Sequence, residues 1–195
     1  MPGQPPPLTD ERALLLAYIK QQRDGLRYAA YGLNEEQIRL APSASALSVG
    51  GLIKHVALTE RGWIDLVVQR DRGGSDEDKW SDYARGFALA PDETLESVLA
   101  LMDEVAAETE AVVNGISDLN QPVPIPKGVP WYPQDVEAWT VRWVLLHIVE
   151  EAARHAGHAD IVRESIDRAT MYGLMAGAEG WPESPWIKPW KPANA

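Results

Sequence analysis

The sequence predicts an all-α fold, a four-helix bundle with long connections and a Pro/Trp-rich C-terminal tail. Four long segments place apolar residues at helical spacing, and no segment alternates apolar and polar residues as a half-buried strand does. The chain has 195 residues, of which 45% are hydrophobic and 24% charged, so we expect one globular core. It contains no cysteine, which excludes disulfides, thiolate zinc sites and cysteine nucleophiles.

The first two helices are predicted from apolar periodicity and from the residues that precede it. One pattern covers residues 11–33, and Thr9 or Asp10 precedes it as a candidate N-cap. The next covers residues 49–70 and follows Ser48. We expect a helix in each segment.

The third and fourth helices are predicted in the second half of the chain. Residues 93–116 follow Pro91 and Asp92 and carry acidic residues early, where the helix dipole favours negative charge. The last pattern covers residues 141–169 and follows Thr140, another candidate N-cap.

The connections are rich in proline and polar residues. We expect a polar loop over residues 71–79 and a long ordered loop over residues 117–134, which contain five prolines. In the C-terminal tail, Trp181, Trp186 and Trp190 lie between prolines, so we expect a non-helical tail whose rings pin it across the bundle. The predicted organisation is a flexible Pro-rich lead (1–8), the bundle (9–176) and the packed tail (177–195).

The charge balance bears on the partners of the protein. Acidic residues outnumber basic ones 29 to 18, which gives a formal net charge of −11. Binding to nucleic acid is not expected, because it depends on lysine and arginine side chains that meet phosphates. No apolar run is long enough to span a membrane, and the first residues lack the features of a secretory signal. We therefore expect a cytoplasmic protein, and the excess of arginine over lysine favours a GC-rich bacterial source.

All four histidines lie on two of the predicted helices, His55 on the second and His147, His155 and His158 on the fourth. At about 100° per residue, these three and Glu151 share the apolar face of the fourth helix. A glutamate on a core-facing stripe is costly unless it is paired, protonated or bound to a metal. The other charged residues of this helix are expected on its solvated face: Glu150, Arg154, Arg163 and Glu164.

One metal ion cannot bind the whole row, because His147 and His155 are about 12 Å apart along the helix. The candidate pairs are His147 with Glu151, Glu151 with His155, and His155 with His158, since bundle cores commonly build metal sites from such spacings. His55 supplies a third ligand, and we favour the combination of His55, Glu151 and His155. It resembles the His₂Glu zinc centres that keep one position open.

Four residues surround His55 on the same helical face, two of them glycines. They are Gly51, Leu52, Thr59 and Gly62. Small residues next to an inward-facing histidine either leave room for an ion and a ligand or allow close helix packing.

Two stretches, SVGGLIKHVALTERGW and WTVRWVLLHIVEEAARHAGHADIVRESID, resemble the DinB/YfiT-like superfamily of four-helix metalloproteins, especially its mini-circle-type branch. The superfamily signature is a histidine in the second helix and two ligands four residues apart in the fourth. By position these are His55, Glu151 and His155. The middle ligand is usually histidine, but the related mycothiol-dependent maleylpyruvate isomerases use a His, Glu, His set. Other residues are expected to support the ligands or to face substrate: His158, His147 and Thr59.

The resemblance implies metal-dependent chemistry, with a low-molecular-weight thiol as cosubstrate in some members. We expect a divalent ion, zinc or nickel, that activates a small thiol or water for a transferase or hydrolase reaction on a small-molecule substrate. Two alternatives remain open: a non-catalytic metal-binding or interaction bundle, and a metal-free bundle whose inward polar residues bond each other. Relatives often pair through helix faces, and with the aromatic tail this favours a homodimer.

Overall fold

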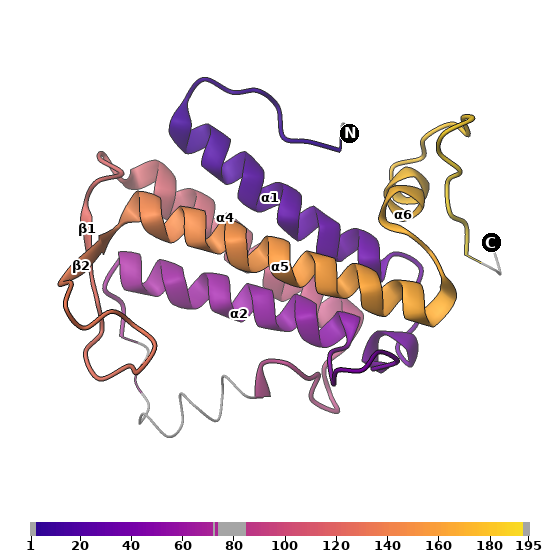
Figure 1. Cartoon of the computed structure of the whole chain (residues 1–195), viewed down its shortest axis with the longest axis horizontal. Coiled ribbons are helices and arrows are strands. Elements are labelled where there is room, and N and C mark those ends of the chain that lie inside the picture. Colours follow the sequence, from indigo (N-terminus) through magenta and orange to yellow (C-terminus); the bar gives the residue numbers. More distant parts are fainter. Residues whose placement is uncertain (1–2, 72, 74–84, 193–195) are drawn as a thin grey trace.

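The computed structural model describes residues 3–71, 73 and 85–192, so most of the polar loop expected over residues 71–79 lies outside the described residues. The all-α expectation is confirmed, because long helices build the fold as a bundle (Figure 1). None of the described helices combines the length and the apolar composition that crossing a membrane requires. The bundle helices are α1 (Glu11–Ala30), α2 (Val49–Val67), α4 (Leu95–Gly115) and α5 (Val141–Asp167).

The connections contain short elements that the sequence pattern did not predict. Strand β1 (Pro122–Pro124) pairs antiparallel with strand β2 (Ala138–Thr140). β1 lies inside the segment expected to be a loop, and β2 follows shortly after that segment. Three residues are too few to show an alternating pattern. A 3₁₀ turn, η1 (Gln37–Arg39), precedes α2, and a further helix, α6 (Met171–Ala178), follows α5 across the expected boundary at residue 176. The strands and α6 lie at opposite ends of the bundle (Figure 1).

The helix starts follow from local capping chemistry. The third bundle helix begins later than expected, because Thr94 rather than Asp92 is its N-cap and forms a capping box with Ser97. The other three starts are confirmed, and each N-cap side chain accepts a hydrogen bond from the backbone N–H three residues on: Asp10, Ser48 and Thr140.

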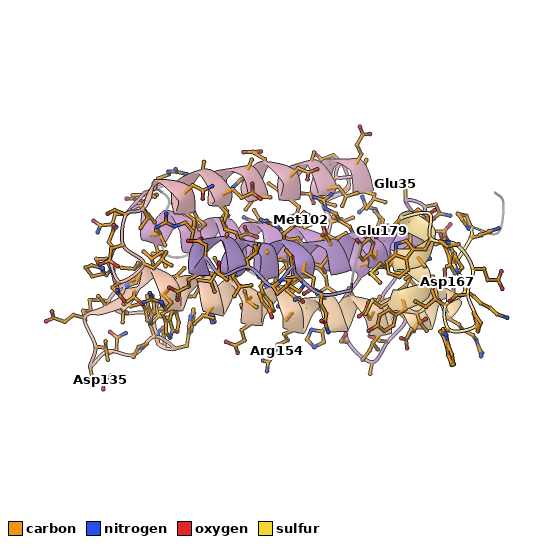
Figure 2. The ribbon with its side chains drawn as sticks, turned by 90° about the horizontal axis from the view of Figure 1, so that it is seen from above. Glu35, Met102, Asp135, Arg154, Asp167 and Glu179 are labelled. Atoms are coloured by element: carbon orange, nitrogen blue, oxygen red, sulfur yellow. The ribbon has the colours of Figure 1, made fainter. Side chains whose placement is uncertain are left out.

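The core is divided along the bundle into two apolar clusters. Met102 of α4 lies buried in one of them, whereas Arg154 of α5 points away from the bundle (Figure 2). Trp63 and Ile148 belong to the other cluster. Where the two clusters meet, each bundle helix contributes one polar residue, and we call this set the polar layer: Arg23, Glu60, Thr109 and Glu151.

The charged-face prediction for Arg163 is wrong, because this side chain is fully buried. Its Nη1 donates hydrogen bonds to the carbonyl oxygens of Ala29 (2.8 Å) and Tyr31 (2.7 Å), which lie where α1 ends and its carbonyls lack helical partners. The guanidinium also pairs with Asp167 and lies 4.7 Å from the ring centroid of Trp190. The end of α1 and the C-terminal tail therefore meet on this one arginine.

The tail is not helical over residues 181–192, as expected. Trp190 packs against the turn that follows α1 and against α6, and its ring lies so close to Gly32 that a Cβ there would collide with it. Trp186, however, is 90% exposed, so the expectation that this ring pins the tail is wrong. The indole N–H of Trp181 donates a hydrogen bond to the carboxylate of Glu179, two residues earlier in the chain (2.9 Å).

Candidate metal centre

Three side chains from two packed helices meet in the bundle: His55 of α2 and Glu151 and His155 of α5. One ligand atom of each lies within 4.8 Å of the other two. The Nε2 atom of His155 is 3.7 Å from Oε2 of Glu151, and the two imidazole ring centroids are 4.7 Å apart. His55 is only 2% exposed, and His155 is also buried. The structure thus brings together the three residues that the sequence favoured, which we call the triad.

The two imidazoles of the triad are held in their neutral form. Burial, and then the proximity of His155, lower the pKa of His55 from 6.5 to about 4. Burial also lowers the pKa of His155, although the negative charge of Glu151 opposes this shift. A neutral imidazole has a free electron pair, so at neutral pH both rings are suited to bind a metal.

The donor set and its spacing fit a divalent ion. Ligands at about 2.0–2.2 Å from a tetrahedral zinc ion lie roughly 3.4 Å from each other. The 4.8 Å limit that encloses the triad atoms therefore leaves only a small side-chain adjustment. Two nitrogens and one carboxylate oxygen form a three-ligand set, which leaves a fourth position for water or substrate.

Phe87, which the sequence reasoning missed, covers one face of His55. The two rings stack with centroids 3.6 Å apart and an interplanar angle of 19°. This contact depends on Gly51, because a Cβ there would collide with the carbonyl oxygen of Phe87; at Gly50 a Cβ would meet Leu89. The space expected at Gly51 for an ion or a neighbouring helix is therefore filled by the segment around Phe87. Two consecutive glycines inside a helix lower its stability. Gly50 and Gly51 were therefore the sequence signal that another segment approaches α2 closely.

Two further expected residues lie next to the triad. The Oγ1 atom of Thr59 is 3.4 Å from Nε2 of His55, one turn along α2. The Nδ1 atom of His158, whose side chain lies at the surface, is 3.5 Å from Nδ1 of His155. Both are placed to orient an imidazole of the triad.

His147 lies away from the triad, in an aromatic cluster at the β1–β2 end of α5. Its ring stacks on Trp143 with centroids 5.1 Å apart and meets Trp63 edge to face at 4.6 Å. Its Nδ1 is 3.3 Å from Glu150 rather than close to Glu151. Of the candidate ligand pairs, the fold therefore does not bring His147 and Glu151 together.

Glu60 is a buried carboxylate that the sequence reasoning also missed. It is 2% exposed, and its Oε1 accepts hydrogen bonds from Nη1 of Arg23 (2.8 Å) and from Oγ1 of Thr109 (2.6 Å). Burial raises the pKa of Glu60, while Arg23 and Thr109 oppose the shift. Its signal was a single acid in the apolar face of α2, between Val56 and Trp63.

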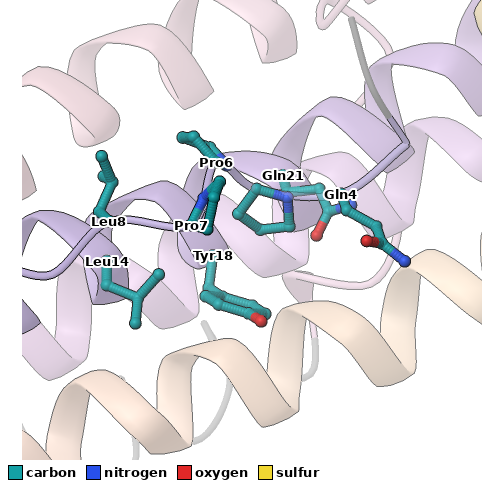
Figure 3. Close-up of a pocket in the computed structure, with 8 residues that line it drawn as sticks. Gln4, Pro6, Pro7, Leu8, Leu14, Tyr18 and Gln21 are labelled. Atoms are coloured by element: carbon teal, nitrogen blue, oxygen red, sulfur yellow. The ribbon is translucent and has the colours of Figure 1, made fainter.

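Two hollows differ in the side chains that line them. A hollow of about 650 Å³ lies between the N-terminal lead and α1 (Figure 3) and is lined by proline, leucine, glutamine and tyrosine, with no carboxylate or imidazole. A much smaller cavity, of about 10 Å³, lies between α2 and α5 beside the triad. Only the smaller one contains metal-ligating groups, and its lining includes Thr59, Glu60, Glu151 and His155.

Comparisons with known proteins agree with this architecture. A family model described as mycothiol S-transferase matches residues 14–168, which include both helices of the triad. A solved structure titled "conserved protein of locus from Enterococcus faecalis" is similar in fold, with a TM-score of 0.63 and 14% sequence identity over 82% of this chain and 98% of that one. A comparison with curated proteins finds no match.

Proposed function

Because the chain belongs to the mycothiol S-transferase family, we propose that it is a metal-dependent transferase that uses mycothiol as its thiol cosubstrate. The metal ion is held by His55, Glu151 and His155. The observation that carries the proposal is the convergence of these three donors, all within 4.8 Å, from two helices of the matched region. Zinc suits two imidazoles and a carboxylate, and nickel is the second choice.

The residues of the chain have separable roles in this proposal. The buried neutral rings of His55 and His155 provide the nitrogen ligands, and the carboxylate of Glu151 offsets part of the positive charge of the ion. Phe87 packs on His55, fixes its ring and keeps water from that side. A divalent ion held by these residues would lower the pKa of a coordinating thiol, so that the thiol would lose its proton to solvent and be present as a thiolate at neutral pH. The chain has no cysteine, so the reacting sulfur comes from the cosubstrate.

The test combines metal content with thiol transfer. Purified protein is loaded with zinc or nickel, the bound metal is quantified, and conjugation of mycothiol to a fluorogenic bimane electrophile is followed. We expect about one ion per chain and a rate that falls to background in His55→Ala. Glutathione is the matched control thiol, and conjugation should be much slower with it.

Two results would contradict the proposal. If the wild-type protein takes up no stoichiometric metal, the triad is not a metal centre. If it binds metal but mycothiol conjugation is no faster than without protein, the non-catalytic metal-binding bundle becomes the better interpretation.

A further inference from the structure

The polar layer is joined by direct hydrogen bonds on three of its four helices. Glu60 of α2 binds Arg23 of α1 and Thr109 of α4 through the same oxygen, Oε1. Glu151 of α5, the fourth member, lines the small cavity together with Glu60. The cavity is therefore lined both by Glu60, which is bonded to the other two helices, and by Glu151 and His155 of the triad.

The other oxygen of Glu60 has no hydrogen-bond partner among the described residues, although it is buried. Because Oε1 is turned toward α1 and α4, Oε2 is the oxygen that remains for the cavity on the α5 side. A buried carboxylate oxygen without a donor is strongly unfavourable. A hydrogen-bond donor in the cavity would remove this cost.

The cavity is suited in size and lining to one small donor. Its volume of about 10 Å³ is close to the minimum that a single water molecule requires, and excludes a larger ligand. A buried water needs two to four polar partners, and Thr59, Glu60, Glu151 and His155 all line this cavity. Water has two hydrogens to donate, which matches a cavity with two carboxylates.

We propose that the cavity between α2 and α5 binds one water molecule that donates hydrogen bonds to Glu60 and to Glu151. Glu60 is then a positioning residue, which acts through this water on the carboxylate of the triad. The inference rests on the proposed function only for its effect on the metal, since the water site itself follows from the cavity and from Oε2. Through it, Glu60 supports the metal centre from the interior of the bundle.

The water site is tested directly by a high-resolution crystal structure of the wild-type protein. We expect an ordered water within hydrogen-bond distance of Oε2 of Glu60. A dry cavity, or a metal ion in it instead of water, would overturn the inference.

The positioning role is tested with cobalt, whose visible absorption reports the geometry of its ligands. The variant is Arg23→Met combined with Glu60→Met, because replacing a buried ion pair by apolar side chains of similar volume is commonly tolerated. We expect a changed cobalt spectrum and an affinity for cobalt about 10–100-fold weaker, the usual range for losing a group that supports a ligand. The matched control is Thr109→Val, which removes a bond to Oε1 and leaves Oε2 and the cavity intact, and it should keep wild-type affinity.

If the double variant does not fold, a second apolar pair, Arg23→Leu combined with Glu60→Leu, replaces it. It also removes the oxygen that holds the water, so several-fold weaker cobalt binding is expected. Wild-type cobalt affinity and spectrum in a folded variant would overturn the positioning role. Failure of the proposed function looks different: the wild-type protein would bind no cobalt, while the water on Glu60 would still be observed.

Discussion

Two buried polar clusters share helix α2: His55 belongs to one and Glu60, five residues later, belongs to the other. The two clusters differ in the charges that they contain. The ion-pair cluster of Arg23, Glu60 and Thr109 contains its own cation, bound to Glu60 at 2.8 Å. The triad consists of two imidazoles that burial keeps neutral and one carboxylate, so it offers electron pairs and no positive charge of its own.

This difference separates a structural role from a ligand-binding role. A buried charge is tolerated when an opposite charge lies beside it, as Arg23 does beside Glu60 in the ion-pair cluster. Converging electron-pair donors are satisfied by a cation from outside the chain, which is the chemistry of a metal site. The predictions below test this distinction, from the largest expected effect to the smallest.

Removing one imidazole of the triad should abolish metal binding. His55→Ala or His155→Ala leaves two protein ligands, and we expect metal affinity to fall by more than about 100-fold, beyond the usual effect of a supporting group. Metal stoichiometry after dialysis measures the effect, and circular dichroism checks the helices. His147→Ala is the control, since His147 packs on Trp143; loss of metal in this variant alone would move the site along α5.

Breaking the ion-pair cluster should lower stability. Arg23→Ala leaves the carboxylate of Glu60 buried without its cation, and the free energy of unfolding should fall by about 3–5 kcal/mol. Urea denaturation measures it. Arg27→Ala is the matched control one turn along α1, because Arg27 pairs with the exposed Asp103 and such pairs contribute at most about 1 kcal/mol. Equal losses in both variants would contradict the distinction.

Acid should destabilise the metal-free protein through His55. Its pKa is about 4 when folded, against 6.5 ordinarily, so between these values the unfolded chain binds a proton that the folded chain does not. The free energy of unfolding therefore falls as pH drops from 6.5 to 4, by up to about 3 kcal/mol from this group. Urea titrations across this range measure the slope, which should be shallower in His55→Gln. An identical slope in the two proteins would show that His55 does not carry the effect.

The smallest effect is expected at His158. Its contact with His155 is long, 3.5 Å, and its side chain is at the surface, so His158→Ala should weaken metal binding by about 10-fold without abolishing it. A competition titration with a chelator is sensitive enough to measure this. Unchanged affinity would leave His158 without a role in holding the ligand.

Local chemistry in the sequence determined much of the fold and the pair of candidate ligands on α5. Apolar periodicity located the four bundle helices, and Asp10, Ser48 and Thr140 marked three of their starts, because a cap bonds a backbone N–H only three residues away. Helical spacing placed Glu151 and His155 on one face. These features depend on residues that are close in the chain.

Only the tertiary structure decided which partners the remaining polar and aromatic side chains meet. Phe87 reaches His55 because two glycines let another segment approach α2, and Arg163 is buried because the end of α1 presents free carbonyls to it. Oε1 of Glu60 accepts hydrogen bonds from residues 37 and 49 positions away along the chain. Helical periodicity reports which face a residue occupies, whereas its partner across the core is set by how distant segments pack.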